Sequence, residues 1–127
     1  MPHLTLEYTE NLGKSINFTS LFSDFHKILS DVGGININNC KSRAVPRREY
    51  FIGSGKENAA FVHLTVSFLE GRSNELKEKI GRHILKTLRD CYSQLMAVYD
   101  LQISVEFIDI PRSLYFKYPE LKQESIR

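Results

Sequence analysis

The second residue of the chain, Pro2, offers the most distinctive chemistry in the sequence. It follows Met1 directly, and an initiator methionine is normally removed when the next residue is as small as proline. Removal would leave Pro2 with a free secondary amine, which no other amino acid supplies. Burial or neighbouring cations lower the pKa of an amine, because both disfavour its charged form. Pro2 is therefore a candidate for a general base that works near neutral pH, although a proline after Met1 can also be an ordinary second residue, and the rest of the sequence has to decide.

Three cationic side chains stand at positions from which they could bind an acid near Pro2. Lys41 and Arg43 are two residues apart, so they would share one face of a strand. Arg72 lies between a glycine and a serine where a strand is expected to give way to a helix, and the first amides of a helix favour anions. A base at one strand end with cations at neighbouring ends suits a small dianionic acid.

The histidines and acidic residues carry weaker signals. The four histidines do not show the spacing of metal ligands. His3 is the nearest of them to Pro2 and is a candidate for a supporting group beside the base. His63 is expected to pack or to form hydrogen bonds rather than to act as a catalyst. Glu7 could pair with His63 or with Lys41, and the sequence leaves its role open.

The hydrophobic pattern predicts the elements that position these residues as two β-α-β units in succession. Alternating apolar residues and turn signals predict strands over 3–8, 41–50, 60–68 and 101–109. Apolar residues at three- and four-residue steps predict helices over 18–32 and 74–97, with Asn17 and Ser73 as caps. Pro46 places the second strand at an edge or a bulge. Two helices can cover one face of a four-stranded sheet, so the predicted fold class is α+β.

The opposite face of the predicted sheet would be polar. Its residues are His3, Thr5, Glu7, His63, Thr65, Ser67, Ser104 and Glu106. Such a face suits solvent, and it also suits a semi-polar interface between subunits.

The size and composition of the chain narrow the classes of function. Its 127 residues predict a single domain, residues 1–127, that is large enough to bury a core. A net charge of +2 is too small to indicate nucleic acid or an anionic membrane as a partner. No apolar run approaches the roughly 20 residues of a membrane helix, and no signal peptide is evident. Cys40 and Cys91 are expected to be thiols in a reducing compartment. These features favour a cytoplasmic protein.

A resemblance to a known family adds to this interpretation. The head Met1-Pro2-His3-Leu4-Thr5-Leu6-Glu7-Tyr8 resembles the tautomerase superfamily, and within it the 5-carboxymethyl-2-hydroxymuconate isomerases. The further matching stretches are Lys41-Ser42-Arg43, Ala60-Phe61-Val62-His63-Leu64-Thr65, Gly71-Arg72-Ser73 and Leu114-Tyr115-Phe116-Lys117. The resemblance runs through nearly the whole length of the chain.

The resemblance implies a homotrimer whose sheets face one another around a three-fold axis. It implies that Pro2 removes a proton from one carbon of a small unsaturated keto acid and returns it to another, with no metal or organic cofactor. Arg72 would hold a carboxylate or polarise the 2-keto oxygen. The family generally has Arg-Ser-Arg where this chain has a lysine, Lys41, ahead of Ser42 and Arg43, so one cation is kept but its planar fork is lost.

Other functions remain open at this point. The same pocket could add water across an activated unsaturated acid, as some relatives do. A non-catalytic trimeric binding protein could use the same scaffold, and Lys41 or a retained Met1 would favour it. A small ferredoxin-like RNA-binding module would bind nucleic acid in a strongly salt-dependent way. The sequence lacks the exposed aromatic pairs that favour RNA binding.

Overall fold

Four strands and two α-helices form the framework that carries the candidate residues. The computed structural model describes residues 1–120. In chain order the elements are β1 (His3–Thr9), η1 (Glu10–Leu12), α1 (Phe18–Asp31), η2 (Ile37–Asn39), β2 (Lys41–Arg47), β3 (Ala59–Leu69), α2 (Asn74–Cys91), η3 (Leu95–Ala97), β4 (Asp100–Ile110) and η4 (Arg112–Leu114), where η marks a short 3-10 helix. This order confirms the two successive β-α-β units.

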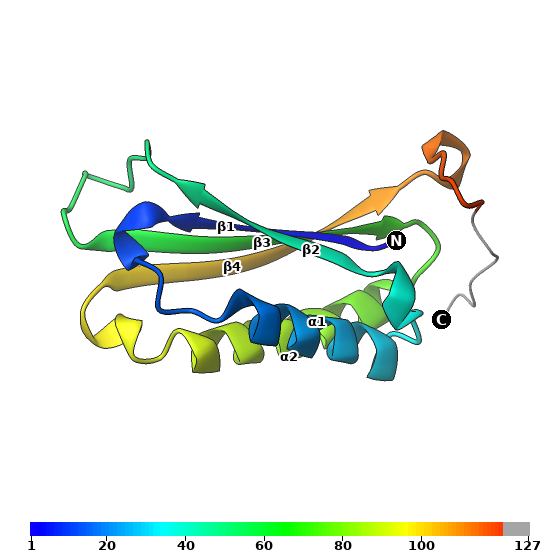
Figure 1. Ribbon diagram of the computed structural model, residues 1–127, viewed down its shortest axis with the longest axis horizontal. Coiled ribbons are helices and arrows are strands. Elements are labelled where there is room, and N and C mark those ends of the chain that lie inside the picture. Colours follow the sequence, from blue (N-terminus) through cyan, green and yellow to red (C-terminus); the bar gives the residue numbers. More distant parts are fainter. Residues whose placement is uncertain (121–127) are drawn as a thin grey trace.

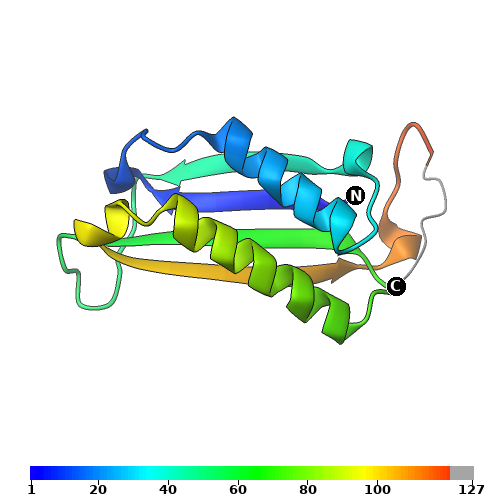
Figure 2. The same cartoon turned by 90° about the horizontal axis from the view of Figure 1, so that it is seen from below.

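The strands form one mixed sheet in the order β2-β1-β3-β4. Within each β-α-β unit the two strands are parallel, β1 with β2 and β3 with β4. The units join through the antiparallel pair β1 and β3. Both helices cover the same face of the sheet, and the second view shows them side by side across the strands (Figures 1 and 2). The predicted fold class is confirmed.

Helix α1 forms where an apolar stripe follows a good cap. The side chain of Asn17 accepts a hydrogen bond from the backbone N–H of Ser20 at 3.1 Å, which satisfies one amide of the first turn. Leu21, Phe25 and Leu29 are buried at the four-residue spacing of one helix face. They pack against the apolar face of the sheet, where alternate residues of β1 and β3 are fully buried.

Helix α2 begins as the sequence predicts but ends earlier. Ser73 accepts a hydrogen bond from the N–H of Leu76 at 3.2 Å. The helix stops at Cys91 rather than continuing to residue 97, and Tyr92 has non-helical backbone angles. Cys91 was expected on the apolar stripe but is exposed, because Tyr92, four residues after the buried Leu88, takes the core position. Cys91 and Tyr92 lie three and four residues after Leu88, on the same face of the helix, so the apolar pattern did not show which of them is buried.

Strand β2 is also shorter than predicted. It ends at Arg47, which is the residue paired with Thr9 at the end of β1. A strand at the edge of a sheet has a single partner, so β2 stops where β1 stops. The edge position of Pro46 is confirmed, because β2 is the first strand in the sheet order. Proline suits an edge, since it has no N–H to donate to a second neighbour.

The face of the sheet away from the helices is polar, as predicted. Ion pairs and hydrogen bonds cross neighbouring strands on this face. Arg47 pairs with Glu7 at 2.8 Å, so the partner of Glu7 is neither His63 nor Lys41. His63 lies 2.6 Å from the hydroxyl of Ser104 and 2.9 Å from the carboxylate of Glu106. These contacts confirm a hydrogen-bonding role for His63.

Within residues 1–120, none of the helices has the length and apolar character needed to cross a membrane.

Candidate active site

Pro2 is buried immediately before β1, at one end of the sheet. Its carbonyl accepts a hydrogen bond from the backbone N–H of Lys41 at 3.0 Å, which ties the chain end to the start of β2. The register of β1 and β3 pairs His3 with Ser67, and one further step along it brings Pro2 opposite Phe68. The residue proposed as a base is therefore held between two neighbouring strands rather than on a loose terminus.

Two amino groups meet one backbone carbonyl beside Pro2. The N-terminal amino group of Met1 donates to the carbonyl of Asn39 at 3.0 Å. The Nζ atom of Lys41 donates to the same oxygen at 3.3 Å. Asn39 is the last residue of η2, the short helix that leads into β2. The start of β2 thus presents both a cation and a hydrogen-bond acceptor to the head of β1.

Lys41 and Arg43 lie on the polar face of the sheet, next to β1. The parallel register pairs Lys41 with His3 and Arg43 with Thr5. The guanidinium of Arg43 lies 2.9 Å from Nδ1 of His3. The other ring nitrogen of His3, Nε2, lies 3.0 Å from the hydroxyl of Tyr115. A chain of three side chains therefore runs from Arg43 through His3 to Tyr115.

The environment of His3 favours its neutral form. Burial is the largest influence that lowers its pKa below the ordinary histidine value, followed by the positive charges of Arg43, Lys41 and the N-terminal amino group. Both influences disfavour the imidazolium. We conclude that His3 is a neutral hydrogen-bonding group in the folded protein at neutral pH.

The lowered pKa values predict a loss of stability on acidification. Burial also lowers the pKa of His26, which bonds to Ser42 on the helix-covered face. The folded chain then binds fewer protons than the unfolded chain, so the free energy of unfolding falls as the pH drops from the ordinary histidine pKa toward the lowered values. We expect urea unfolding to show a smaller fall between about pH 7.5 and 5.5 in a His3→Gln, His26→Gln double variant than in the wild type. An equal or larger fall in the variant would contradict this assignment.

Arg72 lies at the same end of the sheet but in a buried setting. Only 5% of the residue is exposed. Its guanidinium lies over the ring of Phe68, 5.1 Å from the ring centroid, and donates to the carbonyl of Leu69 at 3.3 Å. Because the strand register brings Pro2 opposite Phe68, the aromatic ring links Arg72 to the neighbourhood of the proline. A desolvated guanidinium interacts more strongly with a buried anion than an exposed one does.

The structure brings the predicted residues to one end of the sheet, in two groups. Lys41, Arg43 and His3 gather on the polar face, and Arg72 lies in buried packing beside Phe68. Tyr115 completes the group on the polar face, although sequence reasoning gave it no role. Its signal was present, since Tyr115 belongs to a stretch that carries the family resemblance.

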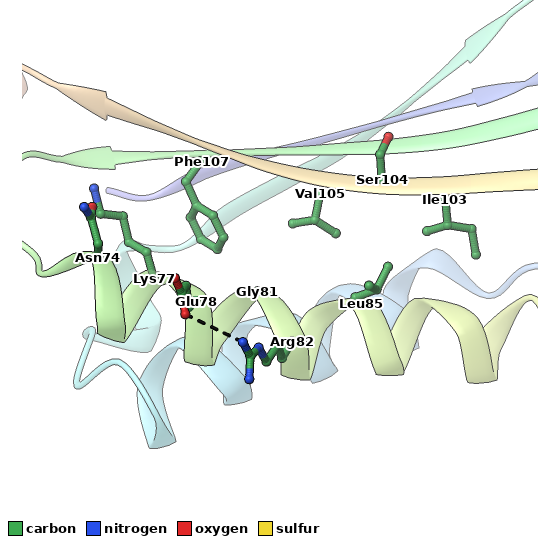
Figure 3. Close-up of a pocket in the computed structure, with 10 residues that line it drawn as sticks. All are labelled: Asn74, Lys77, Glu78, Gly81, Arg82, Leu85, Ile103, Ser104, Val105 and Phe107. Atoms are coloured by element: carbon green, nitrogen blue, oxygen red, sulfur yellow. Dashed lines mark ion pairs between the residues drawn. The ribbon is translucent and has the colours of Figure 1, made fainter.

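An open groove of about 690 Å³ lies at a different place, between α2 and β4 (Figure 3). Its floor is apolar and includes Leu85, Val105 and Phe107. The cations that line it are already paired with carboxylates: Lys77 with Asp109 at 2.8 Å, and Arg82 with Glu78 at 3.7 Å. The groove therefore suits a carboxylic acid less well than the end of the sheet that holds Pro2.

The part of the chain that the structure describes holds no group of side chains suited to a metal centre. Among residues 1–120, no three histidine, cysteine, aspartate or glutamate side chains gather as metal ligands do.

Comparisons with known proteins define the class of this fold. A crystal structure of a 5-carboxymethyl-2-hydroxymuconate isomerase from Deinococcus radiodurans R1 is 30% identical to this chain and superposes with a TM-score of 0.82, covering 91% of this chain and 87% of that one. A fused 4-OT protein described as a symmetric trimer shares the fold at 16% identity, with a TM-score of 0.71 and 94% coverage of both chains. The chain has the fold of the tautomerase superfamily.

The family within this superfamily follows from the sequence. The model of the 5-carboxymethyl-2-hydroxymuconate isomerase family matches residues 2–124. A 5-carboxymethyl-2-hydroxymuconate Delta-isomerase of Escherichia coli is 25% identical over 117 residues, which are 92% of this chain and 93% of that protein. The chain belongs to the 5-carboxymethyl-2-hydroxymuconate isomerase family, a family of isomerases.

Proposed function

We propose that this protein is a cofactor-independent isomerase that uses Pro2 to move a proton within a small unsaturated keto or enol carboxylic acid, most like 5-carboxymethyl-2-hydroxymuconate. The observation that carries the proposal is the position of Pro2, buried at the head of β1 with Lys41 paired to the next residue of that strand. An acid of this kind would be an intermediate in the breakdown of aromatic compounds, in the cytoplasm. Residues 1–127 would act as one domain.

The proposed reaction begins once Met1 has been removed. Lys41, Arg43 and Arg72 lie at the same end of the sheet as the free amine of Pro2, and their positive charge would favour its neutral, basic form. The amine takes a proton from a carbon next to the conjugated carbonyl system, and the electron pair moves onto the carbonyl oxygen to give a dienolate. The proline ammonium then returns the proton to a different carbon, which re-forms the ketone with its double bond moved.

The cations would act on different parts of the substrate. Lys41 and Arg43 extend over the polar face and are exposed, so they would bind carboxylate groups at the mouth of the site. Arg72 is nearly fully buried and would act where water is excluded, on a carboxylate or on the 2-keto oxygen. The same positive charge that binds the acid also stabilises the developing dienolate.

We expect Lys41 to contribute to substrate binding, but less than an arginine at this position would. Replacing Lys41 with alanine removes a charge-assisted hydrogen bond worth about 1.5–3 kcal/mol, so we expect KM to rise by about 10- to 100-fold. Lys41→Arg restores the planar fork and should lower KM below that of the wild type, with kcat little changed in both variants. Steady-state kinetics would measure this, with the exposed Lys14→Ala as the matched control. A KM unchanged in Lys41→Ala would contradict the assignment.

We also propose that the protein works as a homotrimer. The polar sheet face is lined by strand-to-strand pairs such as Arg47 with Glu7 and His63 with Glu106, and it would suit a semi-polar interface. The fused 4-OT protein of the same fold is described as a symmetric trimer. Sedimentation equilibrium would test this proposal, and a monomer at micromolar concentration would contradict it.

The experiment that tests the function follows ketonisation by ultraviolet absorbance. Protein shown by intact mass to lack Met1 is mixed with 2-hydroxymuconate-type dienols and with phenylenolpyruvate. We expect a rate well above that of buffer, with the acid that carries a second carboxylate preferred. No rate with any of these acids, from folded Met-free protein, would overturn the proposal and favour a non-catalytic binding protein.

The same assay separates isomerisation from hydration. A hydratase on this scaffold would add water to an unsaturated acid, so its product would gain the mass of water and lose conjugation. An isomerase leaves the mass of the substrate unchanged. Mass spectrometry of the products from the same reactions decides between the two activities.

A further inference from the structure

We propose that Tyr115 is a further catalytic residue, whose hydroxyl donates a hydrogen bond to the dienolate oxygen formed when Pro2 removes the proton, and that His3 and Arg43 position it. This inference rests on the proposed function. It assigns a task to a residue for which the sequence indicated none, and it gives His3 a defined role.

The direction of each hydrogen bond follows from the groups involved. A guanidinium has donors only, so Arg43 must donate to Nδ1 of His3 at 2.9 Å. A neutral imidazole that accepts at Nδ1 carries its proton on Nε2. The Nε2–H of His3 therefore donates to the hydroxyl oxygen of Tyr115 at 3.0 Å. This bond uses a lone pair of Tyr115 and leaves the hydroxyl proton available to another acceptor.

The groups that face His3 keep this polarity fixed. From β2 it faces Lys41 and Arg43, and the positive charges of these residues and of the N-terminal amino group all disfavour a second proton on the ring. From β3 it pairs with Ser67, and from the segment after η4 it contacts the hydroxyl of Tyr115. The ring therefore stays neutral, so His3 accepts from Arg43 and donates to Tyr115, not the reverse.

The fold brings Tyr115 to the site through an anchored segment. Carboxylate Oε2 of Glu70 accepts the backbone N–H of Arg112 at 2.7 Å, and the carbonyl of Glu70 accepts Nε of Arg112 at 3.1 Å. Glu70 stands two residues before Arg72, so one loop carries Arg72 and also anchors the segment that contains Tyr115. Figure 1 shows this segment at the same end of the sheet as the N-terminus, on the side away from the helices.

The side chain of Tyr115 is turned inward, unlike its neighbours. Leu114 is 70% exposed and Phe116 is 88% exposed, whereas Tyr115 is half-buried. Its ring also meets the ring of His3 edge to face, with the centroids 6.2 Å apart. Two contacts to one residue hold the hydroxyl in a defined place, as a group that stabilises a transition state requires.

The distribution of charge in the substrate indicates which of its oxygens accepts the hydrogen bond of the Tyr115 hydroxyl. Carboxylates carry full charge throughout the reaction, and Lys41 and Arg43 are suited to them. The carbonyl oxygen gains charge only as Pro2 takes the proton, and a positioned hydrogen-bond donor stabilises that change. The proton of Tyr115 stays on its own oxygen. The only proton transferred passes from carbon to the Pro2 nitrogen and back to carbon.

The test is the kinetics of Tyr115→Phe in Met-free protein, with the same dienol acids. Loss of one donor to a developing oxyanion should lower kcat by about 100- to 1,000-fold while KM changes little. Tyr118→Phe is the matched control, because Tyr118 is 96% exposed. An unchanged kcat, or a raised KM alone, would overturn the role of Tyr115 while leaving Pro2 as the base. A wild-type protein without activity would overturn the proposed function and this inference together.

A second pair of variants tests the positioning role of His3. Glutamine can accept from Arg43 with its oxygen and donate to Tyr115 with its nitrogen, whereas leucine can do neither. We expect His3→Leu to lower kcat by about 5- to 10-fold, the worth of one neutral hydrogen bond, and His3→Gln to recover most of that loss. In a Tyr115→Phe background the two His3 variants should have equal kcat. Unequal values there would show that His3 acts by another route.

Discussion

Replacing Pro2 with alanine should lower kcat for ketonisation by about 100- to 10,000-fold, the usual contribution of a positioned general base. Alanine is also small enough for Met1 to be removed, so the variant keeps a free N-terminal amine but loses the secondary amine and the rigid ring. Stopped-flow or steady-state ultraviolet assays of both proteins would measure the ratio of their kcat values. The pH profile of kcat/KM for the wild type would then give the pKa of the proline amine in the free enzyme.

Pro46→Ala is the matched control for this experiment. Pro46 is an exposed proline on the edge strand β2, paired with Tyr8 near the far end of β1. It should leave kcat unchanged, because it lies away from the group of cations at the start of the strands. Equal activity in Pro2→Ala and the wild type, both shown by mass to lack Met1, would remove Pro2 from the mechanism.

Protein that retains Met1 should have no measurable ketonisation activity. With Met1 in place the Pro2 nitrogen belongs to an amide, whose lone pair is delocalised and cannot accept the substrate proton. The methionine is also only 1% exposed, so it fills space at the head of β1. Protein produced while methionine aminopeptidase is inhibited would provide the sample.

The activity of mixed samples should rise in proportion to the Met-free fraction. Intact mass gives that fraction for each preparation, and circular dichroism checks that the two forms fold alike. A preparation that is fully Met-retaining and still fully active would show that the Pro2 nitrogen takes no part in the reaction.

The fold was largely accessible from the sequence because its pattern is regular. Alternation located both ends of β1, β3 and β4 to within a residue, and the caps Asn17 and Ser73 located the starts of α1 and α2. The predictions were wrong at the C-terminal ends of α2 and β2, where the local sequence pattern does not determine the boundary of the element. The end of α2 depends on which of Cys91 and Tyr92 enters the core, and the end of β2 depends on where its only partner ends.

The candidate site could be predicted from the sequence in part. Pro2, Lys41, Arg43 and Arg72 could be named from residue type and spacing, and strand register brings the first three together. The contact between His3 and Tyr115 joins residues 112 positions apart, and no periodicity reports such a contact. The division of the cations between a buried setting for Arg72 and an open one for Lys41 also depends on tertiary packing.

The burial of Met1 has a consequence for when the proposed base, Pro2, can be freed. An aminopeptidase must reach the bond between Met1 and Pro2, and in the folded chain that methionine is enclosed. The partners that enclose the head of β1 come later in the chain, at Lys41 on β2 and Ser67 on β3. At synthesis rates of about 5–20 residues per second, the terminus stays accessible for on the order of several seconds. Under the mechanism proposed above, Met1 must therefore be removed before the sheet closes, because a chain that folds first keeps its methionine and its Pro2 nitrogen remains part of an amide.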